Sequence, residues 1–175
     1  MIREVLRIGS PTLREPSKPV PIESLSGAFF QTMIDDMLET MYHTNGAGIS
    51  APQIGHNFRI MAFEVTQNPR YPKAEPVPLT ILINPSFETL STEKESGYEG
   101  CLSVGELRGL VPRYLHIRYK GFDRDGSIIE REVTQFHARV FQHEFDHLDG
   151  ILFVDRVEDT SSFGFMPELN AAGKI

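Results

Sequence analysis

Apolar residues recur at intervals of three or four positions in two segments of the chain, and this spacing is typical of amphipathic helices. The first segment spans residues 27–43 and stops before Asn45-Gly46, a pair that favours a helix end. The second starts near Thr134, which suits an N-cap, and stops at Gly150. We expect the first stripe to pack in the core; its positions are Phe30, Met33, Ile34, Met37, Leu38 and Met41.

The residues between the two helices are rich in branched and aromatic side chains, which favours strands. We predict strands at residues 58–65, 79–84, 114–122 and 128–133. Asn84-Pro85 is expected to close the second strand, and residues 123–126 to form a hairpin turn between the last two. The proline-rich residues 69–78 are expected to form a surface loop within one sheet system, and residues 158–175 to be partly irregular. The order of helix, strands and helix predicts an α+β fold.

Composition and charge restrict the classes of protein to consider. A chain of 175 residues with 40% hydrophobic and 23% charged content is typical of one globular domain, which we place at residues 1–175. The net charge of -7, without a cluster of Lys and Arg, argues against direct nucleic acid binding. Every apolar run is shorter than the roughly 18 residues of a membrane span, and residues 1–7 do not resemble a secretion signal. We therefore expect a cytoplasmic protein.

The segment Gln142-His143-Glu144-Phe145-Asp146-His147 carries the candidate chemistry. Positions i and i+4 share one face of a helix, so His143 and His147 can hold one divalent cation while Glu144 reaches a water molecule bound to it. This pattern is typical of metallohydrolases. The alternative is that the two histidines form a solvated helical pair and that Glu144 is an ordinary surface charge.

A catalytic metal site usually has three protein ligands, so a third must come from elsewhere in the chain. The metalloprotease pattern HExxHxxGxxH matches up to Gly150, but Phe153 stands where its last histidine would be. Cys101, the single cysteine, lies next to Gly100, and a thiolate with two imidazoles suits zinc or ferrous iron. Alone, such a cysteine is more often a small buried apolar residue. Four downstream carboxylates are also open as ligands: Asp155, Glu158, Asp159 and Glu168.

Three separated segments resemble, in order and spacing, the signature motifs of peptide deformylases. They are Gly46-Ala47-Gly48-Ile49-Ser50-Ala51-Pro52-Gln53, Glu99-Gly100-Cys101-Leu102-Ser103 and the histidine segment above. The resemblance extends to Arg108, Val111-Pro112-Arg113 and Leu152-Phe153, and so covers the chain from residue 1 to about 156. It implies antiparallel or mixed sheets packed around a central C-terminal helix that carries the HExxH motif.

The resemblance also implies an activity, which is removal of the formyl group from the N-terminal formyl-methionine of newly made bacterial proteins, with release of formate. The implied metal ligands are Cys101, His143 and His147. The metal is expected to be Fe²⁺ in the cell, with Zn²⁺, Ni²⁺ or Co²⁺ as substitutes. Metal-bound water would attack the formyl carbon, with Glu144 as the general base and then the general acid.

Further residues receive roles from the same resemblance. The Gln53 side-chain amide and the Leu102 backbone N–H would stabilise the oxyanion that forms on the formyl group. Extended backbone at Ala47, Gly48 and Gly100 would pair with formyl-methionyl peptides or nascent polypeptides like an added strand. The chain lacks the long charged C-terminal helix of some bacterial deformylases, so ribosome contact has weak support, and we expect a monomer.

Several neighbouring residues are expected to support or vary this site. Many deformylases have Leu-Ala in place of Ile49-Ser50 and Pro in place of Gly105. Arg139 lies one helical turn before His143, so its side chain is expected either to face the methionine pocket or to extend outward. We expect an ion pair between Asp146 and an arginine such as Arg113, and a role for Glu99 in ordering the loop around Cys101. Surface or capping positions are expected for His43, His56, His116 and His137.

Two other functions fit parts of the pattern. A general metallopeptidase would use a carboxylate as third ligand and would cleave internal peptide bonds. A noncatalytic paralogue would keep the metal as a structural element or bind formylated peptides without turnover. Retention of Glu144 and Gln53 argues against the paralogue, because a structural site needs neither residue.

Overall fold

Both predicted helices are present in the structure, a computed structural model that describes residues 1–66 and 75–175. Helix α1 spans Ala28–His43 with Gly27 at its N-cap, and α2 spans Gln135–Leu148 with Thr134 at its N-cap. The Thr134 side chain makes no capping hydrogen bond, although its position was predicted. Gly150 has a φ of 73°, in the left-handed region expected of a residue that follows a helix end.

The strands form two sheets, and every pair of neighbouring strands in them is antiparallel. The first sheet has the order β1-β2-β3-β6-β7 and the second the order β4-β5-β8. This confirms the predicted α+β fold. The strands are β1 (Gly48–Ser50), β2 (Ile60–Val65), β3 (Val77–Thr89), β4 (Lys94–Glu99), β5 (Leu107–Tyr114), β6 (His116–Phe122), β7 (Ile128–Thr134) and β8 (Gly164–Phe165).

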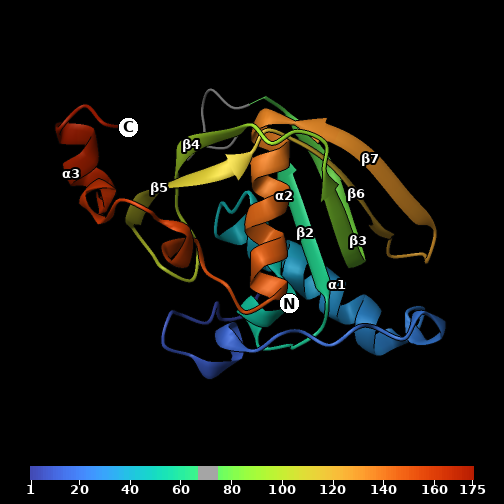
Figure 1. Cartoon of the computed structure of the whole chain (residues 1–175). Coiled ribbons are helices and arrows are strands. Elements are labelled where there is room, and N and C mark those ends of the chain that lie inside the picture. The colour runs from blue at the N-terminus through green and yellow to red at the C-terminus, as the bar shows by residue number, and fades with distance from the viewer. Residues whose placement is uncertain (67–74) are drawn as a thin grey trace.

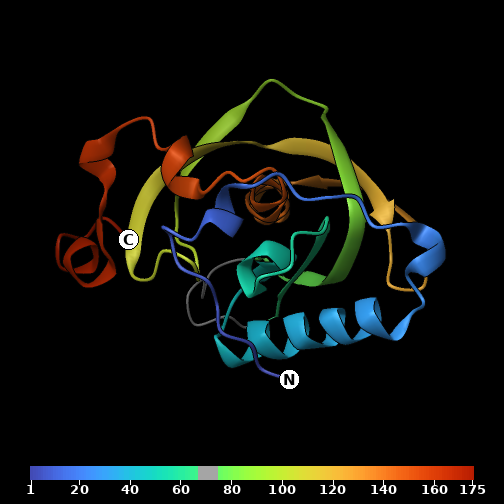
Figure 2. The same ribbon diagram turned by 90° about the horizontal axis from the view of Figure 1, so that it is seen from below.

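Helix α2 lies in the middle of the molecule, with strands of both sheets curving around it (Figures 1 and 2). Strand β2 alternates between the two sides of its sheet, as a period of two requires. Ile60 and Ala62 pack with α1 on one side, whereas Met61 and Phe63 pack with α2 on the other. The five-stranded sheet therefore lies between the two long helices, and α2 is held against both sheets.

The prediction that Asn84-Pro85 closes a strand was wrong. Strand β3 continues to Thr89 through a bulge, because its register with β6 passes from Ile83–Phe122 to Ser86–Lys120. Asn84 adopts a φ of 49°, and its side chain pairs with the backbone N–H and C=O of Val20. Pro85 has no N–H to donate to a neighbouring strand, and the Asn84-Pro85 dipeptide therefore bends β3 at the bulge without ending it.

The hairpin of β4 and β5 was not predicted, because β4 has a polar sequence and, within the part of the chain that the structure describes, pairs only with β5. The strand predicted at residues 114–122 begins at His116, after β5 has ended at Tyr114. Residues 69–74 of the predicted loop lie outside the described residues, and Val77 and Pro78 belong to β3, which pairs with β2. The predicted turn at residues 123–126 is present, with Gly126 at a φ of 84°.

Short helices complete the fold. The tail is partly irregular, as predicted, but it contains a helix α3 at Met166–Ala171 that was not. Within residues 1–66 and 75–175, none of the helices has both the length and the apolar content that crossing a membrane requires. The 3₁₀ helices are η1 (Pro11–Arg14), η2 (Ile22–Ser24), η3 (Ala51–Ile54), η4 (Phe153–Arg156) and η5 (Thr160–Ser162).

Candidate metal centre

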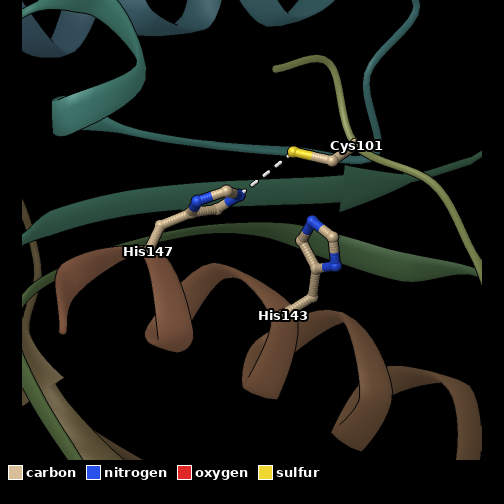
Figure 3. Close-up of side chains that lie close together, drawn as sticks. All are labelled: Cys101, His143 and His147. Carbon is tan, nitrogen blue, oxygen red and sulfur yellow. Dashed lines mark hydrogen bonds between the residues drawn. The ribbon is translucent and has the colours of Figure 1, made fainter. Parts of the chain in front are cut away.

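The three residues proposed as metal ligands lie together, although they come from distant parts of the chain. His143 and His147 project from the same face of α2 toward Cys101, which follows the end of β4 (Figure 3). One potential ligand atom from each residue lies within 4.8 Å of the other two. The shortest separation, 3.3 Å, joins Cys101 Sγ and His147 Nε2. All three side chains are largely buried.

Two glycines allow the surrounding chain to approach this cluster. A Cβ atom at Gly48 would lie 2.4 Å from Glu144 Oε1, and one at Gly100 would lie 2.2 Å from the guanidinium carbon of Arg108. Any side chain at these positions would collide with a group of the site or its support. The close packing of β1 on α2, and of the Cys101 loop on β5, therefore depends on glycine.

A buried carboxylate orients one of the two histidines. Glu99 Oε2 lies 2.9 Å from His143 Nδ1, and the same carboxylate accepts hydrogen bonds from Arg113 and Arg139. A carboxylate on Nδ1 favours the tautomer whose Nε2 lone pair is free to bind a metal. Glu99 thus acts on His143 itself, more directly than the predicted ordering of the Cys101 loop.

Arg113 joins this carboxylate to a second one. It donates to Glu99 and, over 2.6 Å, to Asp146 Oδ2, which confirms the predicted ion pair. Asp146 also accepts from Arg156, whose side chain is 45% exposed. A series of contacts between groups of opposite charge therefore connects His143, through Glu99, Arg113 and Asp146, to Arg156 at the protein surface.

The electrostatics of the cluster favour a thiolate next to positive charge. Burial alone would raise the pKa of the Cys101 thiol, but the charges and hydrogen bonds of His147 and His143 hold that pKa well below its ordinary value. Burial would likewise raise the pKa of Glu99, yet Arg113 and His143 hold it well below its usual range. A divalent cation would supply the positive charge that this thiolate requires and would displace the imidazole protons.

Glu144 lies beside the cluster in a buried environment. Its exposed fraction is 4%, and burial raises the pKa of its carboxyl group. The hydroxyl of Ser50 lies 2.8 Å from Glu144 Oε2, and the two groups form a hydrogen bond. A buried carboxyl group with a raised pKa is suited to accept and return a proton near neutral pH.

Gln53 is held in a defined orientation by three contacts. Its Oε1 accepts from the backbone N–H of Ser50 at 2.9 Å. Its Nε2 donates to Ser103 Oγ at 3.1 Å and lies 3.5 Å from Cys101 Sγ. The donor end of the amide therefore points toward the cluster, as an oxyanion-stabilising role requires.

A pocket opens onto these residues. Ala47, Gly48 and Gly100 line it, and among the described residues β1 is an edge strand with one neighbour, β2. Arg139 also lines the pocket, but its guanidinium donates to backbone oxygens of Glu95 and Val111 and forms an ion pair with the Glu99 carboxylate at 3.0 Å. The lining residues are Gly46, Ala47, Gly48, Gln53, Tyr98, Glu99, Gly100, Cys101, Leu102, Phe136, Arg139, Val140, His143 and Glu144.

The donor set fits a divalent transition metal. One sulfur and two imidazole nitrogens are ligands that zinc and ferrous iron accept, whereas magnesium and calcium prefer oxygen. Within the described residues, the downstream carboxylates do not belong to the group that could hold an ion. Asp155 instead pairs with Arg14, and Asp159 caps η5. Phe153, in the place of the protease histidine, packs against the ring of His143.

The other histidines lie away from the cluster. His43 is exposed at the end of α1, and His116 pairs with Glu132. His56 is partly buried and lies edge-on to Phe29. His137 departs from the predicted surface position, because it is half-buried with its ring between Phe63 and Tyr119.

Sequence reasoning assigned no role to several residues of the site. Tyr98, Phe136 and Val140 line the pocket, and Ser50 contacts Glu144. The helical spacing of Phe136, Val140 and His143 was a signal for the pocket wall. The signal for Ser50 was its position inside the first motif, at a residue where many deformylases have Ala.

Comparisons with known proteins agree on one family. A family model described as polypeptide deformylase matches residues 2–162. The chain is 52% identical to peptide deformylase 1 of Bordetella pertussis over 165 residues, which cover 94% of this chain and 93% of the relative. It is similar to a Met-Ala-Ser-bound class I type b peptide deformylase from Acinetobacter baumannii, with a TM-score of 0.86 and 36% identity over 90% of this chain and 99% of that one. The peptide deformylase of Thermotoga maritima has a TM-score of 0.78 at 35% identity, covering 91% of this chain and 99% of that one.

Proposed function

The chain belongs to the peptide deformylase family, and from this premise we propose that it removes the N-formyl group of formyl-methionyl nascent chains by metal-assisted hydrolysis in the bacterial cytoplasm. Peptide deformylases are metalloenzymes, and the observation that carries the proposal is the buried cluster of Cys101, His143 and His147 beside Glu144. The A. baumannii relative with Met-Ala-Ser bound supports a peptide that begins with methionine as the substrate class.

Cys101, His143 and His147 would hold one divalent ion, with Fe²⁺ as the native metal and Zn²⁺, Ni²⁺ or Co²⁺ as substitutes. Such an ion supplies a Lewis acid that acidifies water and polarises the formyl oxygen. Glu99 would keep the His143 ring oriented for binding, through its contact with Nδ1.

Glu144 would move the proton of the reaction. Its carboxylate takes a proton from the attacking water and returns it to the departing amine, which becomes the new N-terminus. Burial of this side chain supports the assignment, because burial brings a carboxyl pKa closer to neutrality. General acid–base catalysis of this kind contributes about 10²- to 10⁴-fold in rate.

Two donors would stabilise the negative charge that develops on the formyl oxygen. They are the Gln53 side-chain amide and the Leu102 backbone N–H. The Gln53 amide is already oriented by Ser50 and Ser103, so little reorganisation is needed when the charge forms. Loss of one such donor typically lowers kcat by about 10²- to 10³-fold.

The peptide would bind as an added strand. Ala47 and Gly48 lie at the edge strand β1, and Gly100 lines the same pocket. Main-chain pairing on both sides would hold any sequence after methionine. An acetyl methyl group would need room beside the attacked carbon that a formyl hydrogen does not, so acetylated peptides should be poor substrates.

The test uses protein purified without oxygen and loaded with iron. We expect formate release from a formyl-methionyl tripeptide and none from its acetyl counterpart. Glu144→Ala should abolish turnover while metal content stays at one ion per chain. Equal rates on both peptides, or no formate from the iron-loaded protein, would reject the proposed activity.

The metal ligands are tested by Cys101→Ser. This variant should lose metal affinity and formate release together, because a neutral hydroxyl is a poor substitute for a thiolate. Unchanged metal content and rate would instead favour the metallopeptidase with a carboxylate ligand. Loading the wild-type chain with Fe²⁺, Ni²⁺, Co²⁺ and Zn²⁺ in turn, and comparing kcat, assigns the metal that supports turnover best.

A further inference from the structure

We infer that Ser50 is a positioning residue that determines which oxygen of Glu144 takes part in proton transfer. The inference rests on the proposed function, because it concerns the residue proposed there as general base. Ser50 holds Oε2 as the anchored oxygen and leaves Oε1 as the reacting one.

The anchoring contact is short and fully enclosed. Ser50 Oγ lies 2.8 Å from Glu144 Oε2, and the exposed fractions of the two residues are 0% and 4%. A hydrogen bond from a hydroxyl to a buried carboxylate is stronger than one between neutral groups. Because solvent does not reach this contact, bulk water does not take the place of the hydroxyl.

The second oxygen has a different neighbour. Glu144 Oε1 lies where a side chain at Gly48 would begin, 2.4 Å from the position of a Cβ atom there. Gly48 and Glu144 both line the pocket, so Oε1 is the carboxylate oxygen next to a pocket-lining residue, whereas Oε2 is next to Ser50. The two oxygens are thus distinguished by the chain before any substrate binds.

The Ser50 hydroxyl has a second acceptor on the same residue. Its Oγ lies 3.0 Å from the main-chain oxygen of Glu144 as well as 2.8 Å from Oε2. One hydroxyl hydrogen can serve only one of them at a time. It can donate to Oε2, or it can turn to the main-chain oxygen. Neither state leaves the buried hydroxyl hydrogen without an acceptor.

Ser50 also connects the two proposed catalytic side chains. Its backbone N–H donates to Gln53 Oε1 at 2.9 Å, while its side chain holds Glu144. A substitution of Ser50 by Ala removes the hydroxyl and keeps this backbone donor. Ser50→Ala therefore separates the positioning of Glu144 from that of Gln53.

The experiment compares metal-loaded wild type, Ser50→Ala and Ser162→Ala on the formyl-methionyl tripeptide. Ser162 is a matched control, because it is buried, its hydroxyl accepts from the Leu110 backbone, and it does not belong to the residues that line the pocket. We expect Ser50→Ala to lower kcat roughly tenfold, the lower limit for loss of a hydrogen bond to a charged group. KM and metal content should stay within about twofold of wild type, and Ser162→Ala should keep kcat. An unchanged kcat, or a change in KM alone, would overturn the inference.

A second measurement does not depend on turnover. Melting temperatures of wild type, Ser50→Ala, Glu144→Gln and the double variant form a thermodynamic cycle. We expect shifts that do not add, because the two side chains share one hydrogen bond. Additive shifts would overturn the inference even if formate release were observed. Non-additive shifts in a protein that releases no formate would reject the proposed function and retain the contact.

Discussion

The two faces of helix α2 are built in opposite ways. The face toward β2 and β6 is apolar, with Phe141 stacked on Tyr119 at a centroid distance of 4.5 Å and in edge contact with Phe63. The face toward β4 and β5 is held by charges and amides: Asp146 pairs with Arg113, and Gln142 exchanges two hydrogen bonds with the backbone of Tyr114. Apolar packing therefore holds the helix on one side, and directional hydrogen bonds and ion pairs hold it on the other.

This difference shows how a binding site can be rigid inside a packed protein. Apolar packing is non-directional and sets how closely α2 lies to the sheet. Buried ion pairs with defined hydrogen bonds set how the helix is rotated, and so where His143 points. A site that needs ring nitrogens placed to within a fraction of an ångström requires both.

The largest effect is expected from Arg113→Ala, on the charged face. It leaves the carboxylates of Glu99 and Asp146 buried without their shared partner. Breaking a buried pair in this way costs about 3–5 kcal/mol in the free energy of unfolding, and two carboxylates favour the upper end. Urea unfolding measures it. Arg156→Ala removes another partner of Asp146 that is 45% exposed and should cost less than about 1 kcal/mol. Equal costs would contradict the assignment of the charged face to the interior.

Phe141→Ala tests the apolar face. The Phe141 side chain is 0% exposed, and its removal should lower the free energy of unfolding by about 3–5 kcal/mol through lost burial and a cavity. The same urea titration gives the value. Phe141→Leu keeps most of the volume and should cost clearly less. If the variant stays folded at low temperature, its metal affinity should remain near that of wild type, because this face does not contact the ligands.

Glu99→Gln changes the charged face with little change in shape. The amide cannot compensate Arg113 and is a weaker acceptor for His143 Nδ1, so the ring is oriented less firmly. Metal affinity should fall by about 10- to 100-fold, as for other substitutions behind a metal ligand. Competition with a coloured chelator measures this. Affinity equal to that of wild type would mean that Glu99 contributes to folding alone.

The smallest expected effect is a pH dependence on the apolar face, from His137. Burial, followed by the positive charge of Arg131, lowers the pKa of His137 to about 4 from its ordinary value of 6.5. The unfolded chain therefore takes up this proton first as pH falls. The contribution of His137 to the free energy of unfolding is therefore constant above about pH 6.5, and it falls as the pH is lowered from about 6.5 to about 4. His137→Gln should flatten this part of the curve of melting temperature against pH; a curve parallel to wild type would contradict the assignment.

The sequence predicted the elements on the apolar side of α2 better than those on its charged side. Both long helices follow from periodicity, and β2, β6 and β7 follow from their composition. The β4–β5 hairpin could not be predicted, because Lys94, Glu95 and Ser96 have none of the features of a core strand. Its stability comes in part from α2. Arg139 on that helix donates hydrogen bonds to the backbone oxygens of Glu95 and Val111, which are distant from it in the chain.

The candidate site was predicted residue by residue only through the resemblance of three motifs. Residue chemistry alone reached His143, His147 and Glu144 and left the third ligand open. The contact between Ser50 and Glu144 joins residues 94 positions apart in the chain, and no local pattern predicts it. Such a contact depends on how β1 is positioned along α2, and only the tertiary structure defines that position.

The central place of α2 also has a consequence for synthesis of the protein. Strands β1 to β7 all precede residues 135–148, so a growing chain presents Phe63, Leu82 and Tyr119 before the helix that covers them has been made. A domain whose core is completed late in the sequence exposes apolar surface to aggregation during translation. Slow translation of the segment before residue 135 would therefore be expected to lower the yield of native protein, whereas slow translation after residue 150 would not.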